Sequence, residues 1–150
     1  MKYILILILL LSGCGSNDPK VIGIIDGDTI KILQDGEEVK VRLAEIDCPE
    51  RKQPFHTQAK KYTSELVFGK KVEIKNGGWD RYHRLIAIVI LPDGRVLNKE
   101  LVRAGYAWQY DDYSKDKSYG DLEEEARKAK KGLWLDKNPI PPWEFRKKKR

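Results

Sequence analysis

Acidic residues and an arginine gather in two short segments, residues 25–32 (IDGDTIKI) and residues 41–50 (VRLAEIDCPE). The groups concerned are Asp26, Asp28, Arg42, Asp47 and Glu50, and Arg84 follows in the segment DRYHR at residues 80–84. Carboxylate oxygens are the ligands that Ca²⁺ and Mg²⁺ prefer, and a planar guanidinium group can grip two oxygens of a phosphate. Neighbouring strands that carry both kinds of group are suited to hold a metal ion and a phosphodiester together. This is the chemistry needed to hydrolyse a nucleic-acid backbone.

Each of these groups also has a purely structural interpretation. Residues 26–28 form an Asp-Gly pair within a hairpin turn, and residues 47–50 are typical of a helix start with a capping glutamate. Arg42 could form a structural ion pair with Asp47 or Glu45. These interpretations do not explain why all the elements occur together in this order, so the combination favours a catalytic site.

The chain is long enough for one domain with a modest core. It has 150 residues and a net charge of +6. A basic surface suits a polyanionic partner such as nucleic acid, but many small soluble domains carry a few excess charges. Net charge therefore favours a nucleic-acid partner only slightly.

The N-terminus predicts export. An apolar run from Tyr3 to Leu11 is too short to span a bilayer, which takes roughly 20 residues, but suits a signal peptide. The residues that follow, Ser12-Gly13-Cys14, resemble the bacterial lipobox. We expect a signal peptide at residues 1–13, an acylated Cys14 and a tether at residues 14–19. This would make the chain a membrane-anchored lipoprotein of the bacterial cell envelope, whereas the alternative is an ordinary cleaved signal peptide with an incidental cysteine.

Hydrophobic alternation and turn residues predict an α+β fold. The strands are expected at residues 21–25, 29–33, 39–44, 71–75 and 85–91, and the helices at 56–68, 98–105 and 119–131. Gly27 is expected to take a positive φ, Asn98 to cap its helix, and residues 76–78 (NGG) to separate two strands. Five strands with a helix between the third and fourth predict a five-stranded OB-fold β-barrel with three helices.

The C-terminal residues 137–150 are rich in proline and basic residues. Three prolines predict an extended tail, and the basic run at residues 146–150 is most often solvated. We expect the run to add affinity for nucleic acid or anionic lipid, and its removal to leave turnover nearly unchanged. Four tryptophans are expected to pack rather than to stack on bases: Trp79, Trp108, Trp134 and Trp143.

Four segments together resemble the staphylococcal nuclease (thermonuclease) family. IDGDTIKI, VRLAEIDCPE, WDRYHRLIAIV and LVRAGYA occur in that family in the same order and at similar spacing. The resemblance covers about residues 20–135, which predicts a nuclease domain at residues 20–136. It implies an OB barrel with helices and a Ca²⁺-dependent phosphodiesterase that acts on DNA and RNA and leaves 3′-phosphate ends.

The resemblance also implies metal ligands. Asp28 and Asp47 are the side-chain ligands that it suggests, and Asp26 would act in the outer shell through water. Cys48 would contribute its backbone carbonyl at a position where the family commonly has threonine.

The remaining roles concern the substrate. By the same resemblance, Arg42 and Arg84 hold the scissile phosphate and Glu50 acts as the general base on water. The nucleotide groove is implied to include Arg81, Tyr82 and Tyr113. His83 occupies a position where the family usually has glycine, which affects the local turn.

Two other functions remain as alternatives. The chain could be an OB-fold nucleic-acid-binding module without catalysis, or an envelope lipoprotein that binds anionic polymers. In each case we expect a monomer with no protein partner, attached to the membrane through Cys14.

Overall fold

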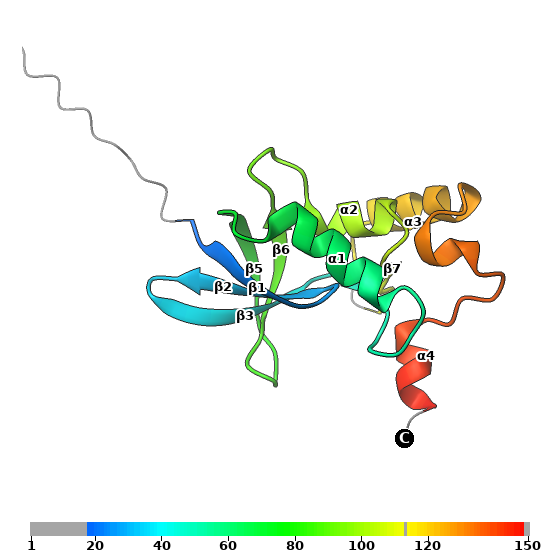
Figure 1. Ribbon diagram of the computed structural model, residues 1–150, viewed down its shortest axis with the longest axis horizontal. Coiled ribbons are helices and arrows are strands. Elements are labelled where there is room, and N and C mark those ends of the chain that lie inside the picture. The colour runs from blue at the N-terminus through cyan, green and yellow to red at the C-terminus, as the bar shows by residue number, and fades with distance from the viewer. Residues whose placement is uncertain (1–17, 113, 149–150) are drawn as a thin grey trace, which may run out of the picture.

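The computed structural model describes residues 18–112 and 114–148, so Cys14 and Tyr113 lie outside the described residues. Its main sheet has five strands in the order β1-β2-β3-β6-β5 (Figure 1). These strands are β1 (Lys20–Asp26), β2 (Thr29–Gln34), β3 (Glu37–Leu43), β5 (Glu73–Trp79) and β6 (Leu85–Ile90). All neighbours pair antiparallel except β3 and β6, which are parallel.

The sheet curls until β1 lies beside the segment that leads into β5. The Val21 amide donates to the Lys70 carbonyl at 2.9 Å, and the Gly69 amide donates to the Val21 carbonyl at 2.9 Å. The Val72 amide, just before β5, donates to the Pro19 carbonyl at 3.0 Å. These bonds join the start of β1 to the segment that leads into β5, which confirms the predicted five-stranded OB-type barrel.

Apolar residues from alternate strand positions fill the barrel. Fully buried members include Val21, Ile30, Ile32, Val41, Leu43 and Val89. Alternation puts the neighbouring residues of each strand on the outer face, so Arg42 lies outside this core between two buried residues.

Helices cover one side and one end of the barrel (Figure 1). The three predicted helices are confirmed as α1 (His56–Val67), α2 (Leu97–Arg103) and α3 (Ser118–Lys128). A short 3₁₀ helix, η1 (Gly132–Leu135), and a two-stranded sheet of β4 (Ile46–Asp47) and β7 (Trp108–Gln109) complete this end. Among the residues the structure describes, no helix has the length and apolar character that crossing a membrane requires.

The expected extended tail is wrong for part of its length. Pro142 begins a further helix, α4 (Pro142–Lys147), which lies below α1 at the right of Figure 1. Proline suits the first helical position because its missing N–H would have no partner there and its φ is already helical. The clustered prolines therefore mark a helix start rather than a wholly extended chain.

Two further local expectations are also wrong. Strand β5 continues to Trp79 through an irregularity at residues 76–79, so the NGG segment does not end it. Asn98 does not cap α2, because the helix begins at Leu97. The buried Asn98 side chain instead accepts from the Val89 amide at 3.0 Å and donates to the Ala44 carbonyl at 3.0 Å. It thus fixes the turn between β3 and β4.

Candidate active site

The β1–β2 turn presents the first two acids and packs tightly against its neighbours. Gly27 does not have the expected positive φ. A Cβ on this glycine would lie 2.9 Å from Cys48 Sγ and 2.9 Å from Ala59 Cβ, so close approach excludes a side chain. Thr63 Oγ1 of α1 donates to the Gly27 carbonyl at 2.6 Å. The turn is therefore held from two sides.

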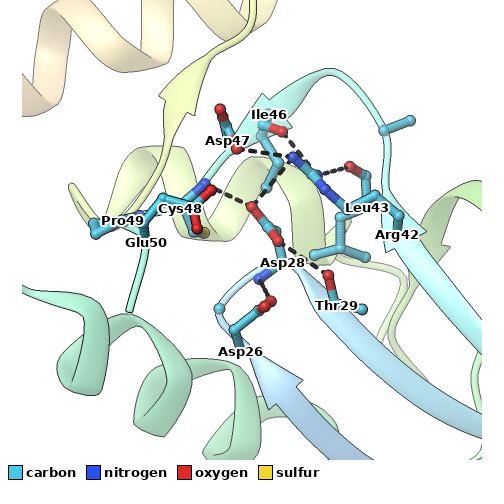
Figure 2. A network of polar contacts seen from close by, with 12 residues as sticks. Asp26, Asp28, Thr29, Arg42, Leu43, Ile46, Asp47, Cys48, Pro49 and Glu50 are labelled. Carbon is cyan, nitrogen blue, oxygen red and sulfur yellow. Dashed lines mark hydrogen bonds and ion pairs between the residues drawn. The ribbon is translucent and has the colours of Figure 1, made fainter. Parts of the chain in front are cut away.

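Asp28 connects this turn to the segment after β4 (Figure 2). Its buried carboxylate accepts from the Cys48 amide at 2.6 Å through Oδ2 and from Thr29 Oγ1 at 3.2 Å through Oδ1. The bond to Cys48 brings Asp28 beside Asp47, although the two are far apart in sequence.

Arg42 joins the two aspartates. Its Nη2 lies 2.9 Å from Asp47 Oδ1 and 3.3 Å from Asp28 Oδ2, and Figure 2 shows all three side chains converging. Its Nη1 donates to the Ile46 carbonyl at 2.9 Å. Burial opposes its charge, but Asp28 and Asp47 outweigh burial and raise the Arg42 pKa. The ion pair considered for Arg42 and Asp47 is confirmed, and it forms inside the candidate site.

A second arginine, predicted from the sequence to lie in a solvated tail, also enters the site. Arg146 of α4 places Nη1 2.6 Å from Glu50 Oε1 and Nη2 2.8 Å from Asp47 Oδ2. Burial opposes its charge too, but hydrogen bonds to Asp47 and Glu50 outweigh this and raise its pKa. The solvated interpretation is wrong for Arg146. Only the folded chain brings residue 146 to residue 47.

The site contains more acidic than basic groups. Its acids are Asp26, Asp28, Asp47 and Glu50, and its bases are Arg42 and Arg146. Burial and then the charge of Asp28 raise the pKa of Asp26 to about 7. Burial also raises the Asp47 pKa, although hydrogen bonding to Arg146 and the charge of Arg42 offset part of the rise. Crowded carboxylates of this kind favour an additional cation.

Arg84 lies beside this cluster rather than within it. The parallel register pairs Arg42 with Ile86, so Arg84, two residues earlier, lies on the same face of the sheet. Its Nε and Nη2 each lie 2.8 Å from Asp80 Oδ2. The predicted pair of arginines therefore shares one face, and Asp80 holds the second of them.

Comparison with known proteins fits this geometry. The model of a family described as staphylococcal nuclease homologue matches residues 40–136. The chain belongs to the staphylococcal nuclease family. An "Uncharacterized endonuclease" of Escherichia coli is 38% identical over 99% of this chain and 99% of its own length. One of the same name from Haemophilus influenzae is 41% identical over 100% of this chain and 85% of its own. A "Micrococcal nuclease" of Shigella flexneri is 36% identical over 85% of this chain and 79% of its own.

The turn between β5 and β6 carries two of the residues that the family resemblance placed in the nucleotide groove. The Arg81 guanidinium carbon lies 4.8 Å from the Tyr82 ring centroid, and that of Arg84 lies 5.4 Å from it. Tyr82 is 60% exposed. His83 has a φ of 56°, a left-handed conformation that glycine adopts more readily. The turn thus combines an exposed aromatic ring with two cations, the two kinds of group that bind single-stranded nucleic acid.

The tryptophans divide into two groups. Trp108 and Trp134 are buried with ring centroids 4.4 Å apart, and Trp143 packs on Trp108 at 5.8 Å, which confirms the packing prediction for these three. Trp79 is 62% exposed at the end of β5, so the packing prediction is wrong there. Its position next to the Tyr82 turn makes it an additional candidate for contact with bases.

The donor set fits Ca²⁺ in its chemistry. Within residues 18–112 and 114–148, no three His, Cys, Asp or Glu side chains are arranged to hold a metal. However, two buried carboxylates, Asp28 and Asp47, already converge on one cationic nitrogen, and oxygen ligands of this type suit a hard cation. Burial raises the pKa of the Cys48 thiol, and a soft sulfur ligand suits Ca²⁺ less well than the oxygens beside it.

Proposed function

We propose that this protein is a Ca²⁺-dependent phosphodiesterase that hydrolyses DNA and RNA and leaves 3′-phosphate ends. The observation that carries the proposal is the convergence of Asp28 and Asp47 on the Arg42 guanidinium, with Glu50 at the same site. Relatives named endonuclease and micrococcal nuclease support it.

Asp28 and Asp47 would hold the metal with their side chains and Cys48 with its backbone carbonyl, while Asp26 would act through water. Bound there, Ca²⁺ would act as a Lewis acid that neutralises charge on a phosphoryl oxygen. Two protein carboxylates leave much of the coordination to water, so we expect weak metal binding without nucleotide.

The two phosphate-binding arginines differ in how they are held. Arg42 Nη1 donates to two backbone carbonyls, which fixes the plane of the guanidinium group, so a phosphate bound beside the two aspartates would meet Nη2. Arg84 would approach from the same face of the sheet. Both would meet negative charge that builds on the phosphoryl oxygens in the transition state.

Glu50 would remove the proton from the attacking water. The P–O5′ bond then breaks, the 5′ oxygen takes a proton from solvent, and the phosphate remains on the 3′ side. Trp79 and Tyr82 would support the bases by stacking.

A plate assay with DNA or RNA as the substrate, with Ca²⁺ or with excess chelator, tests this proposal. We expect clearing of both substrates with Ca²⁺ only. Binding without hydrolysis would favour the OB-fold binding module, and equal hydrolysis in chelator would remove the metal from the mechanism.

Loss of Asp28 is expected to impair metal binding. Asp28→Ala removes a proposed ligand and leaves the Cys48 amide without its acceptor, whereas Asp28→Asn keeps an acceptor oxygen and loses only the charge. We expect both variants to bind Ca²⁺ about 100-fold more weakly in calorimetry. Asp121→Ala, at an exposed aspartate on α3, serves as the control. Wild-type affinity in the folded Asp28→Asn protein would contradict the ligand assignment.

We also propose that the protein is an exported lipoprotein anchored through Cys14. Two or three acyl chains on one cysteine would give stable membrane attachment, where a single chain gives marginal binding. Mass spectrometry of the native N-terminus is expected to find an acylated Cys14 as the first residue. An unmodified chain that starts at or after Gly15 would contradict this.

A further inference from the structure

Arg146 connects the C-terminal helix to two carboxylates of the candidate site. Its guanidinium group spans Glu50 Oε1, at 2.6 Å, and both oxygens of Asp47, at 2.8 and 3.3 Å. A guanidinium fork is suited to holding two acceptors at a fixed separation. One side chain therefore sets the position of Glu50 relative to Asp47.

Helix α4 is docked by aromatic packing on the strand opposite Asp47. Trp143 stacks on Tyr110 with ring centroids 5.4 Å apart and an angle of 3°, and it meets Trp108 edge-on at 5.8 Å. Trp108 pairs with Asp47 in the β4–β7 sheet. Strand β7 thus supports both α4, which packs on it, and Asp47, which pairs with it.

A second connection joins the tail to the Glu50 segment. Gln53 Nε2 donates to the Ile140 carbonyl at 2.9 Å, and Gln53 Oε1 accepts from the Glu50 amide at 2.7 Å. The backbone of Glu50 and the approach to α4 are therefore linked through one side chain.

Glu50 otherwise lies on an irregular stretch of chain. Residues 48–55 between β4 and α1 belong to neither a helix nor a strand, and Lys52 and Phe55 have positive φ values of 77° and 66°. Such a segment does not by itself hold a side chain as a helix or strand would. Arg146 engages Oε1 of Glu50, and no described contact engages Oε2, so one carboxylate oxygen is left to accept a proton.

We propose that Arg146 is a positioning residue for catalysis, which holds the Glu50 carboxylate beside Asp47, and that α4 is part of the active site. This inference rests on the proposed nuclease function and on Glu50 as its base. The opposite possibility is that α4 blocks the site and that its removal raises activity. Docking by Trp143 and Gln53, together with the oxygen left on Glu50, favours positioning.

The kinetic test compares Arg146→Ala with Lys147→Ala, which removes the next positive charge of the same helix. We expect Arg146→Ala to lower kcat roughly 10²-fold, as a displaced catalytic group does, with a smaller change in KM. Lys147→Ala is expected to leave kcat close to wild type. Arg146→Lys should recover kcat only in part, because one ammonium group cannot bridge both carboxylates. Added guanidinium ion at non-denaturing concentration should partly restore Arg146→Ala.

Hydrogen exchange in the metal-free protein gives a measurement independent of turnover. Amides of residues 48–55 are expected to exchange faster in Arg146→Ala, while the barrel amides keep their wild-type rates. Trp143→Ala should have the same effect on these residues, because it undocks α4 and leaves both carboxylates in place.

The outcomes distinguish this inference from the proposed function. Wild-type kcat in Arg146→Ala, or a higher kcat after removal of residues 141–150, would overturn the positioning role. If the wild-type protein itself hydrolysed neither DNA nor RNA, the proposed function would fail, and the inference that depends on it would fail too. Unchanged exchange at residues 48–55 in Arg146→Ala would overturn only the inference.

Discussion

Glu50→Gln is expected to lower kcat by roughly 10²–10⁴-fold, the usual contribution of a general base. Glutamine keeps the shape of the side chain and an oxygen that can accept from Arg146, so the segment around residue 50 should keep its conformation. The variant loses only the capacity to take a proton from water. Folding and Ca²⁺ affinity are therefore expected to remain close to wild type.

Single-turnover cleavage of DNA at saturating Ca²⁺ measures this loss directly. Calorimetry on the same protein checks metal binding. Glu38→Gln, which removes an exposed carboxylate paired with Lys31, is the matched control and should cleave normally. Cleavage by Glu50→Gln at the wild-type rate would falsify the assignment of Glu50 as the base.

Arg42→Met is expected to destabilise the fold as well as abolish cleavage. Arg42 is the shared partner of Asp28 and Asp47, whose side chains are 9% and 3% exposed. Methionine fills much of the volume of the arginine side chain, but it removes the positive charge that Arg42 provides to both buried carboxylates. Loss of one partner from a buried ion pair costs about 3–5 kcal/mol, so we expect the free energy of unfolding to fall by this amount.

Urea unfolding followed by circular dichroism measures the change in stability. Lys128→Met provides the control, because Lys128 pairs with Glu124 on the surface of α3 and the two side chains are 72% and 64% exposed. A surface ion pair contributes little to stability, so we expect only a small loss in this variant. Equal losses in the two variants would show that the Arg42 pairs contribute no more than surface contacts.

Most of the fold was predictable from local patterns. Alternating apolar residues predicted the five barrel strands, and helical spacing predicted α1, α2 and α3, because these signals depend on neighbours a few positions apart. The local expectations that failed, at Gly27, Asn98 and residues 76–78, concern residues whose role is set by what packs on them. Close packing against Cys48 explains why residue 27 is a glycine. Asn98 is explained by two partners on β6, the Val89 amide that donates to it and the Ala87 carbonyl that accepts from it.

The candidate site, like the fold, was predictable only in part. Its acids and Arg42 could be identified from local sequence, since they lie within two short segments on adjacent strands. How these charges pair depends on the folded chain, as do the contact between Asp80 and Arg84 and the contacts of Arg146 with Asp47 and Glu50. No local pattern distinguishes Arg146 from its basic neighbours, because its acidic partners lie far away in the sequence. Glu50, for example, precedes Arg146 by 96 residues. That contact exists because Trp143 and Gln53 dock α4 beside β4, and packing of this kind depends on the whole folded domain.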